Sequence, residues 1–226
     1  MGITGTVGKR LAPRISQAAP GLTHGFVRTA LERAIKGVGS LPGAATIGQR
    51  LLDEHRGDVD KTIHELIEMH VRYAGAQGFV TNLGGLVTAA VAIPANVTGL
   101  ALIQCRMVAS IAWLRGYDLD DPRVRNAILA TILGEDDVEK LIRKRRLPAP
   151  PMALATAPQY DPDLDRVVAG EVAAELITRV AGKRLASTIG RRVPVVGGVV
   201  GLTVDGFETW RVGRYADREL LPRARR

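Results

Sequence analysis

Hydrophobic residues recur at helical spacing along most of the chain, and residues 58–79 give the clearest case. One face of a helix over this segment carries Ile63, Leu66, Ile67, His70, Val71 and Ala74, and the other carries Lys61, Glu65, Glu68 and Arg72. No window shows the strict alternation, bounded by hairpin turns, that predicts paired strands. The pattern therefore predicts an all-α protein.

Helix start and stop signals support the same fold class. Asp121 before Pro122 is expected to cap a helix that Gly134 ends. Residues 135–146 place acidic side chains first and basic ones last, as the helix dipole favours. Asp161 and Pro162 open a further helix in the same way.

A long stretch without charge occupies residues 78–104, and no charged residue occurs between Arg72 and Arg106. A membrane-spanning helix needs about 20 apolar residues, which this stretch has, but Pro94 and Asn96 are expected to divide it. Three interpretations follow: buried helices of a compact domain, a shallow hairpin in one leaflet, or a true span. The interruption favours the buried helices.

A second glycine-rich apolar segment covers residues 193–216. Small residues at intervals of four let a neighbouring helix approach closely, so we expect the two glycine-rich segments to pack together in the core of a single compact multi-helix domain. The glycines expected at this contact are Gly84, Gly85, Gly197, Gly198 and Gly201. Leucine at Gly198 or Gly201 is expected to destabilise the fold by roughly 1–3 kcal/mol through overpacking.

Composition changes along the chain predict its organisation. Residues 1–22 contain prolines and scattered basic residues and are expected to form a flexible basic arm. Residues 147–162 are a Pro-Ala linker that separates two halves of a helical domain over 23–221. Residues 222–226 form a basic tail.

The overall composition narrows the class of protein. The 226 residues can bury a sizeable core, and 24% charged residues with a mean hydropathy of +0.06 argue against a polytopic membrane protein. The net charge of +8 favours anionic partners. The single Cys105 excludes an intramolecular disulfide, and the N-terminal residues lack a signal-peptide core. Together these features predict a cytoplasmic protein, and the arginine-rich composition is typical of a GC-rich bacterial genome.

The sequence predicts no catalytic or metal site. The run "HELIEMH" resembles a zinc-protease motif, but Glu68 stands four residues after His64, where the second histidine is needed. Glu171 and Glu175 lie one helical turn apart, on a face expected to be solvated, with Glu175 paired to Arg179. No nucleophile motif or cofactor motif is present, so no cofactor is expected.

Three polar residues interrupt apolar surroundings and are candidates for buried polar groups. His70 lies within the apolar face of its predicted helix, where a hydrogen-bonded core histidine is expected rather than a ligand. Arg106 ends the first uncharged stretch, and Asp205 interrupts the second. A charge in such a place must pair, lose its charge or face water.

Basic residues form clusters near predicted helix ends. The candidates for binding a membrane or another anion are Arg143, Lys144, Arg145, Arg146, Lys183, Arg184, Arg191 and Arg192. Because no aromatic residues interleave with them for base stacking, they favour an anionic bilayer over nucleic acid.

The order of these segments resembles a known family. It is carried by "GFVTNLGGLVTAAVAIPANVTGLALIQCRMVASIAWLRGYDLDDPRVR", then "ILATILG", then "RRVPVVGGVVGLTVDGFETWRVGRYADREL". Over residues 44–220 the chain resembles the EcsC family, named after a protein associated with an ABC transporter. The resemblance implies a mostly helical bacterial protein linked to membranes or transport, without assigned catalytic residues. The basic arm and the Pro-Ala linker are expected to depart from the family.

Two functions of different classes remain open from the sequence. The first is a non-enzymatic, peripheral membrane-associated or transport-linked interaction protein of bacteria. It would act at the cytoplasmic face of the membrane and bind an anionic lipid surface or a membrane protein complex. The alternative is a lipid- or peptide-directed enzyme with a pocket between the two halves that uses Glu171, Glu175, His70 or Asp205. The oligomeric state is open.

Overall fold

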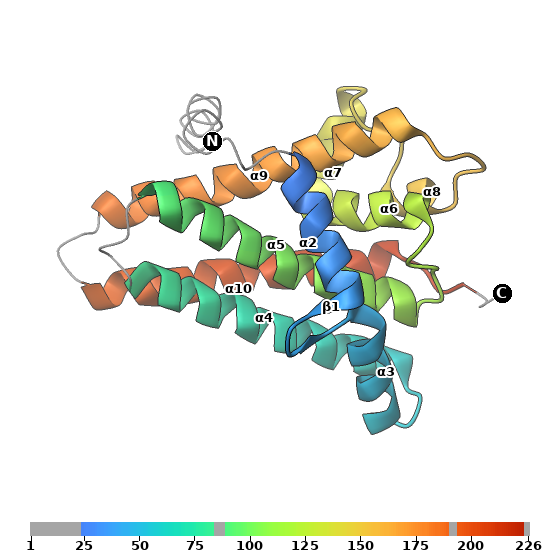
Figure 1. The fold of residues 1–226 in the computed structure, drawn as a ribbon, viewed down its shortest axis with the longest axis horizontal. Helices are drawn as coiled ribbons and strands as arrows, with labels where there is room; N and C mark the ends of the chain where they lie inside the picture. The colour runs from blue at the N-terminus through green and yellow to red at the C-terminus, as the bar shows by residue number, and fades with distance from the viewer. Residues whose placement is uncertain (1–23, 84–88, 190–193, 224–226) are drawn as a thin grey trace.

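The computed structural model describes residues 24–83, 89–189 and 194–223, and gives only the backbone for residues 24, 78–83, 89–96, 179–189 and 194–203. In chain order the elements are α2 His24–Lys36, β1 Gly37–Val38, β2 Leu41–Pro42, α3 Ala44–Glu54, α4 Val59–Leu83, α5 Ala89–Leu114, α6 Pro122–Leu133, α7 Glu135–Arg143, α8 Pro151–Ala155, α9 Pro162–Ile189 and α10 Pro194–Glu219 (Figure 1). The strands form one antiparallel pair. Within the described residues everything else that is regular is helical, which confirms the all-α prediction.

Several helices begin and end where the sequence predicts. The Asp121 carboxylate accepts a hydrogen bond of 2.8 Å from the backbone N–H of Arg123 and so caps α6. Gly134, at a φ of +84°, ends α6 and precedes α7. That conformation is open to glycine at little steric cost. The Asp161 carboxylate caps α9 in the same way, at 2.9 Å from the N–H of Asp163.

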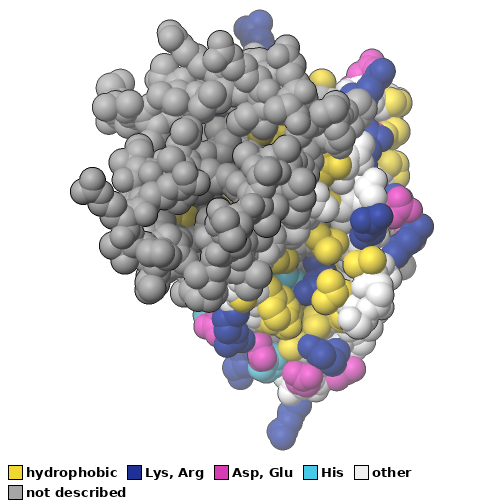
Figure 2. Space-filling view, turned by 60° about the vertical axis from the view of Figure 1, so that its left-hand side comes forward, with side chains coloured by type: hydrophobic (Ala, Val, Ile, Leu, Met, Phe, Trp, Pro, Cys, Tyr) yellow, Lys and Arg dark blue, Asp and Glu magenta, His cyan; other side chains and the backbone are white. Residues whose placement is uncertain are grey.

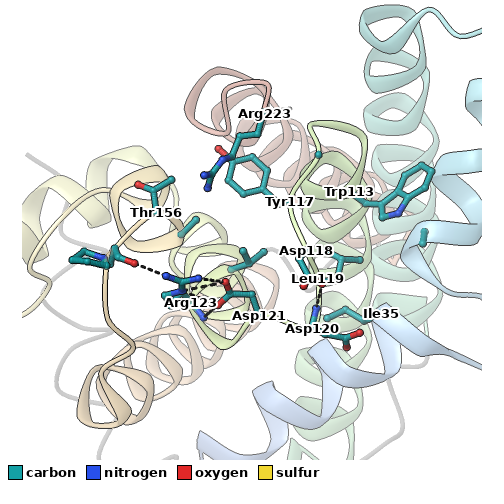
Figure 3. Close-up of a pocket in the computed structure, with 16 residues that line it drawn as sticks. Ile35, Trp113, Tyr117, Asp118, Leu119, Asp120, Asp121, Arg123, Thr156 and Arg223 are labelled. Atoms are coloured by element: carbon teal, nitrogen blue, oxygen red, sulfur yellow. Dashed lines mark hydrogen bonds and ion pairs between the residues drawn. The ribbon is translucent and has the colours of Figure 1, made fainter. Parts of the chain in front are cut away.

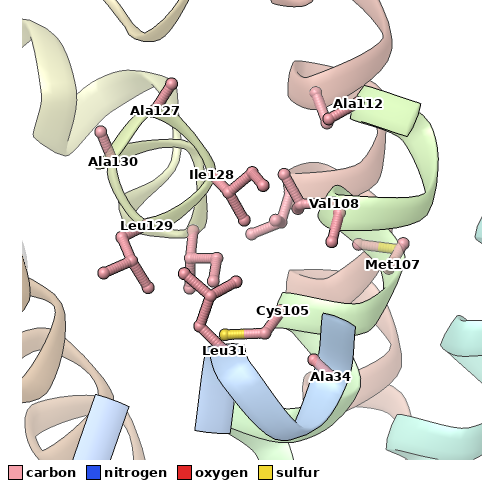
Figure 4. Packing of buried hydrophobic residues seen from close by; sticks show 14 of the residues in the cluster. Leu31, Ala34, Cys105, Met107, Val108, Ala112, Ala127, Ile128, Leu129 and Ala130 are labelled. Atoms are coloured by element: carbon pink, nitrogen blue, oxygen red, sulfur yellow. The ribbon is translucent and has the colours of Figure 1, made fainter. Parts of the chain in front are cut away.

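Helix α5 forms the centre of the molecule and is contacted by α2, α3, α4, α6, α9 and α10. Figure 4 shows its side chains Cys105 and Val108 among Leu31 of α2 and Ile128 of α6, and all four are buried. Burial raises the pKa of the Cys105 thiol. A helix that is apolar all round is buried on all sides, which explains the uncharged stretch over much of its length.

The most extensive helix contact joins α4 and α10, which run antiparallel. A Cβ atom at Gly213 of α10 would lie 2.9 Å from Ile67 Cγ1 of α4 and 3.1 Å from Met107 Sδ of α5. Gly213 is therefore the described glycine that lets three helices meet. Of the glycines expected at this contact, Gly197, Gly198 and Gly201 belong to the α10 backbone, and Gly84 and Gly85 lie outside the described residues.

The expected interruption at Pro94 and Asn96 is wrong. Helix α5 begins at Ala89 and continues through both residues, while α4 ends at Leu83. A proline this close to the start of a helix removes one backbone hydrogen bond from a helix that packing stabilises elsewhere. Among the described residues one window, Val97–Leu114, is long and apolar enough to cross a membrane, and 72% of it is buried inside the protein.

The Pro-Ala segment 147–162 is part of the packed structure. It contains α8, which packs on α6, with Leu154 buried. The backbone N–H of Met152 donates a hydrogen bond of 3.0 Å to the Glu219 carboxylate of α10. The segment therefore connects the two halves of the helical domain through contacts as well as through the chain. Residues 1–22, predicted as a basic arm, lie outside the described residues.

Candidate functional site

One end of the molecule combines uncharged helix segments with five of the eight basic residues that make up the net charge. We call residues 73–104 and 176–204 the hairpin end, because α4 and α9 end there while α5 and α10 begin (Figure 1). These segments contain no acidic residue. Five basic residues lie in 176–204, and three more lie in 1–23. Together they equal the net charge of +8, because the rest of the chain has 23 basic and 23 acidic residues.

Exposed aromatic side chains lie where the hairpin end meets the rest of the molecule. Tyr73 is the first residue of the hairpin end on α4 and is 45% exposed. Phe207 and Trp210 follow Asp205 on α10 and are exposed, with their rings stacked at 6.0 Å between centroids. Figure 2 shows hydrophobic side chains gathered on the surface beside the residues that are not described, with basic side chains among them. Aromatic residues of this kind are enriched where proteins meet the membrane–water interface.

The basic cluster at residues 143–146 is exposed and partly paired. Arg143 lies 3.3 Å from the Glu139 carboxylate, and Arg146 forms an ion pair with Glu171. No described acidic side chain pairs with Lys144 or Arg145. This cluster therefore offers fewer free charges than the sequence suggests.

The second basic cluster lies further toward the hairpin end. Lys183 and Arg184 belong to the α9 backbone, and Arg191 and Arg192 lie outside the described residues. Because Arg146 reaches Glu171, twelve residues before Lys183, the two clusters are separated by about 18 Å along α9. The predicted pairing of Glu175 with Arg179 rests on a side chain that is not described.

His70 and Arg106 form a buried polar pair between α4 and α5. They are 0% and 6% exposed. The Nδ1 atom of His70 lies 2.8 Å from the Leu66 carbonyl oxygen, which can only accept, so Nδ1 carries the proton. Nε2 then accepts a hydrogen bond of 3.2 Å from Arg106 Nε. Burial, together with the Arg106 charge, lowers the pKa of His70 to about 4, so the ring is neutral at pH 7.

Asp205 is also buried, at 3% exposure, on the face of α10 that packs against α4 and α5. One turn further along α10, the Thr209 hydroxyl accepts a hydrogen bond of 3.3 Å from the Gln104 side chain of α5. Of the four polar residues of the alternative enzyme, His70 contacts Arg106 and Glu171 contacts Arg146.

A cavity of about 810 Å³ lies at the opposite end from the hairpins, near the end of α5 and the start of α6 (Figure 3). Arg123 in its wall binds the Asp121 carboxylate and donates a hydrogen bond of 2.6 Å to the Ala157 carbonyl oxygen. The Arg123 hydrogen bonds hold the pKa of Asp121 below its usual range. Asp118 accepts a hydrogen bond of 2.9 Å from the Asp120 N–H. These hydrogen bonds join the start of α6 to the segment after α8 and fix the turn before α6.

A smaller cavity of about 560 Å³ lies between the start of α7 and α10. Arg211 pairs with Asp136 at 2.5 Å and Arg218 with Glu135 at 2.6 Å, so opposite charges across it neutralise each other. Among the described residues, no group of three or more His, Cys, Asp or Glu side chains is arranged to hold a metal ion.

The fold and this distribution of charge define an all-α protein in which five of the eight surplus basic residues belong to the segment 176–204. The chain belongs to the EcsC protein family, whose model matches residues 6–223. The match therefore extends beyond residues 44–220, and both the segment from residue 6 onward and the Pro-Ala segment lie inside the matched range. No curated protein and no solved structure shows significant similarity to the chain.

Sequence reasoning missed two features of this region. The contact of Arg106 with the ring of Tyr73, at 5.6 Å from its centroid, joins residues 33 positions apart, and no local pattern indicates it. Gly213 lies in the second glycine-rich segment, 193–216, but away from the cluster of Gly197, Gly198 and Gly201 on which the sequence prediction rests. No local sequence pattern around Gly213, which stands three residues after Trp210, marks it as a contact between helices.

Proposed function

We propose that this protein is a peripheral membrane-associated protein that docks on an anionic lipid surface through its hairpin end. The observation that carries the proposal is the coincidence, at one end of the molecule, of uncharged helix ends and a purely basic surplus (Figure 1). Each Lys or Arg near an anionic membrane surface contributes about 1 kcal/mol of attraction. The five basic residues of 176–204 can therefore supply several kcal/mol.

The lengths of the uncharged helix ends support docking in one leaflet. The α4 segment after Arg72 contains 11 uncharged residues, 73–83, and the α10 segment before Asp205 contains 11, 194–204. Each corresponds to about 16 Å of helix, close to half of the roughly 30 Å hydrocarbon core. The exposed ring of Tyr73 lies at the inner limit of the α4 segment, and Trp210 follows the α10 segment by six residues, about 9 Å of helix, so both lie on the side where an interfacial aromatic residue is favoured.

The cytoplasmic face of a bacterial membrane fits this proposal, because anionic lipids give that surface a negative potential. A basic end attracts the protein to the surface, and apolar helix ends then contribute burial of hydrocarbon. The same end also suits a membrane protein complex with an acidic surface, which is a different partner with a different test.

Vesicle co-sedimentation of the full chain tests the proposal. We expect binding to vesicles containing phosphatidylglycerol at low salt and no binding to phosphatidylcholine vesicles. Electrostatic attraction fades within a Debye length, about 8 Å at physiological ionic strength, so release at high salt indicates surface docking and retention indicates insertion of the helix ends. Equal binding to both kinds of vesicle, or to neither at any salt, would overturn the proposal and favour a protein partner.

A further inference from the structure

Arg106 is a buried cation without a counter-ion in the described structure. Its side chain is 6% exposed. Its protein contacts are the hydrogen bond from Nε to His70 and the ring of Tyr73 below the guanidinium. No acidic side chain of the described residues pairs with it. Burying a charge is costly unless another group compensates for the water it loses, so this arginine lacks a partner that its position calls for.

His70 orients the guanidinium but does not neutralise it. The ring is neutral, with Nδ1 bonded to the Leu66 carbonyl oxygen and Nε2 accepting from Arg106. Only Nε of Arg106 is used in this bond, while the two Nη atoms, which form the planar fork that matches an anion, make no hydrogen bond with a described residue. His70 is therefore a positioning residue for the fork.

Tyr73 supplies a second unused polar group beside the first. Its ring stacks under the Arg106 guanidinium at 5.6 Å and meets the His70 ring edge-on at 5.9 Å. The side chain is 45% exposed, and its hydroxyl makes no hydrogen bond with a described residue. The site is thus held on one side by buried contacts and open to the surface on the other.

We propose that Arg106 and Tyr73 bind one phosphate group at the surface between α4 and α5. The two Nη groups of Arg106 and the phenol hydroxyl are three donor groups on two side chains that contact each other, and a phosphate offers several acceptor oxygens to bridge them. A carboxylate satisfies the fork but leaves fewer oxygens for the hydroxyl. The charge of the phosphate supplies the counter-ion that the protein lacks.

The phosphate can belong to a lipid headgroup or to a soluble molecule. The lipid source rests on the proposed function, because Tyr73 and Arg106 lie at the inner limit of the hairpin end, where lipid phosphates would stand if the helix ends occupied one leaflet. The partly buried apolar side chains Met69, Leu102 and Ile103, close in sequence on the same two helices, suit an acyl chain more than a free ion.

Three variants of the full chain test the site. Tyr73→Phe removes only the hydroxyl, and Arg106→Gln removes the fork. Arg72→Gln is the matched control, because Arg72 is an exposed cation beside Tyr73 on α4. One readout is the rise of the melting temperature with inorganic phosphate at constant ionic strength. The other is binding to vesicles of phosphatidylglycerol against phosphatidylcholine.

We expect inorganic phosphate to stabilise the wild-type protein. Tyr73→Phe should bind phosphate about three- to tenfold more weakly than the wild type, which corresponds to the loss of one neutral hydrogen bond. Arg106→Gln should lose at least tenfold, and Arg72→Gln less than about twofold. Because the Tyr73 hydroxyl has no partner, Tyr73→Phe should melt as the wild type does without phosphate, so the test does not depend on Arg106→Gln folding.

The outcomes separate the site from the membrane proposal. Tyr73→Phe and Arg106→Gln that bind both phosphate and anionic vesicles as the wild type does would overturn the site and leave membrane docking intact. Phosphate stabilisation that depends on Tyr73, in a protein that binds no vesicles, would support the site with a soluble source and overturn the membrane proposal. Loss of vesicle binding in Tyr73→Phe but not in Arg72→Gln would support the lipid source.

Discussion

The two ends of the molecule differ in how their basic residues are balanced by acidic ones. At the end where α5 finishes, which we call the paired end and define by residues 115–125 and 211–223, arginines are tied to carboxylates. Arg115 lies 2.7 Å from Asp217 and 3.1 Å from Asp60, and so joins the ends of α5, α10 and α4. The hairpin end has basic residues and no acid to pair with them. The five basic residues of 176–204 therefore give this end a net positive charge.

This difference shows that the net positive charge of the protein comes from particular segments of the chain. Each exposed ion pair contributes little stability, with a median of about 0–1 kcal/mol. Its two opposite charges nevertheless cancel each other's electric field at a distance. The paired end and the body are neutral as a whole, and the field of the molecule arises at the hairpin end and in residues 1–23. Such a field orients a protein toward an anionic surface.

The largest expected effect breaks this comparison directly. Replacing four basic residues of the hairpin end with glutamine should weaken binding to phosphatidylglycerol vesicles at low salt by about a thousandfold, because each basic residue contributes about 1 kcal/mol. The positions changed are Lys183, Arg184, Arg191 and Arg192. The matched control changes the same number of basic residues at 143–146, where Arg143 and Arg146 already have acidic partners. Co-sedimentation measures both, and equal losses would contradict the special role of the hairpin end.

The next effect is the pH dependence of stability that arises from the buried pair of His70 and Arg106, at the inner limit of the hairpin end. The pKa of His70 is about 4 in the folded protein and 6.5 in a model peptide. Between these values the unfolded chain binds a proton that the folded one does not, so stability falls as the pH drops from about 6.5 to about 4. The loss approaches about 3 kcal/mol, at 1.36 kcal/mol per unit of pKa.

Urea unfolding of the wild type and His70→Gln across that pH range measures this contribution. The variant should lose part of the dependence on pH, whatever its stability at neutral pH. His64→Gln removes an exposed histidine from the same helix and is the control. Identical slopes for the wild type and His70→Gln would mean that the histidine is not held neutral.

A smaller effect sharpens the structural side of the comparison. Leucine at Gly213 has no room between Ile67 and Met107 and should lower the free energy of unfolding by roughly 1–3 kcal/mol. Thermal melting measures the change, which corresponds to about 2–4 °C for each kcal/mol in a domain of this size. Unchanged melting would show that α4, α5 and α10 do not meet as closely as the structure places them.

The smallest effect has the opposite sign. Gly170 lies within α9, and no heavy atom outside its own turn lies within 4 Å of the place that a Cβ would take. Alanine there should stabilise the helix by up to about 1 kcal/mol, because glycine costs that much in a helix interior. Gly170→Ala is also the matched control for Gly213, since both are helical glycines and only one is enclosed. Destabilisation by alanine at Gly170 would reveal a contact on α9 that the described residues do not contain.

The sequence by itself determined the fold class and many helix limits, because those depend on neighbours in the chain. The cap at Asp121, the stop at Gly134 and the start at Pro162 are local choices of backbone conformation, and each is readable within a few residues. The absence of acids from 73–104 and 176–204 is also a property of the sequence. This absence suggests a docking surface only because the fold brings both segments to one end of the molecule.

Tertiary structure alone decided what depends on distance in space. Pro94 signals a break, yet α5 continues through it, because packing outweighs the loss of one hydrogen bond. Arg106 is visible in the sequence as the end of an uncharged run, but its ring partner Tyr73 and its neutral neighbour His70 lie on another helix. Side-chain pairs across helices depend on the register and rotation of whole elements, which no local pattern encodes.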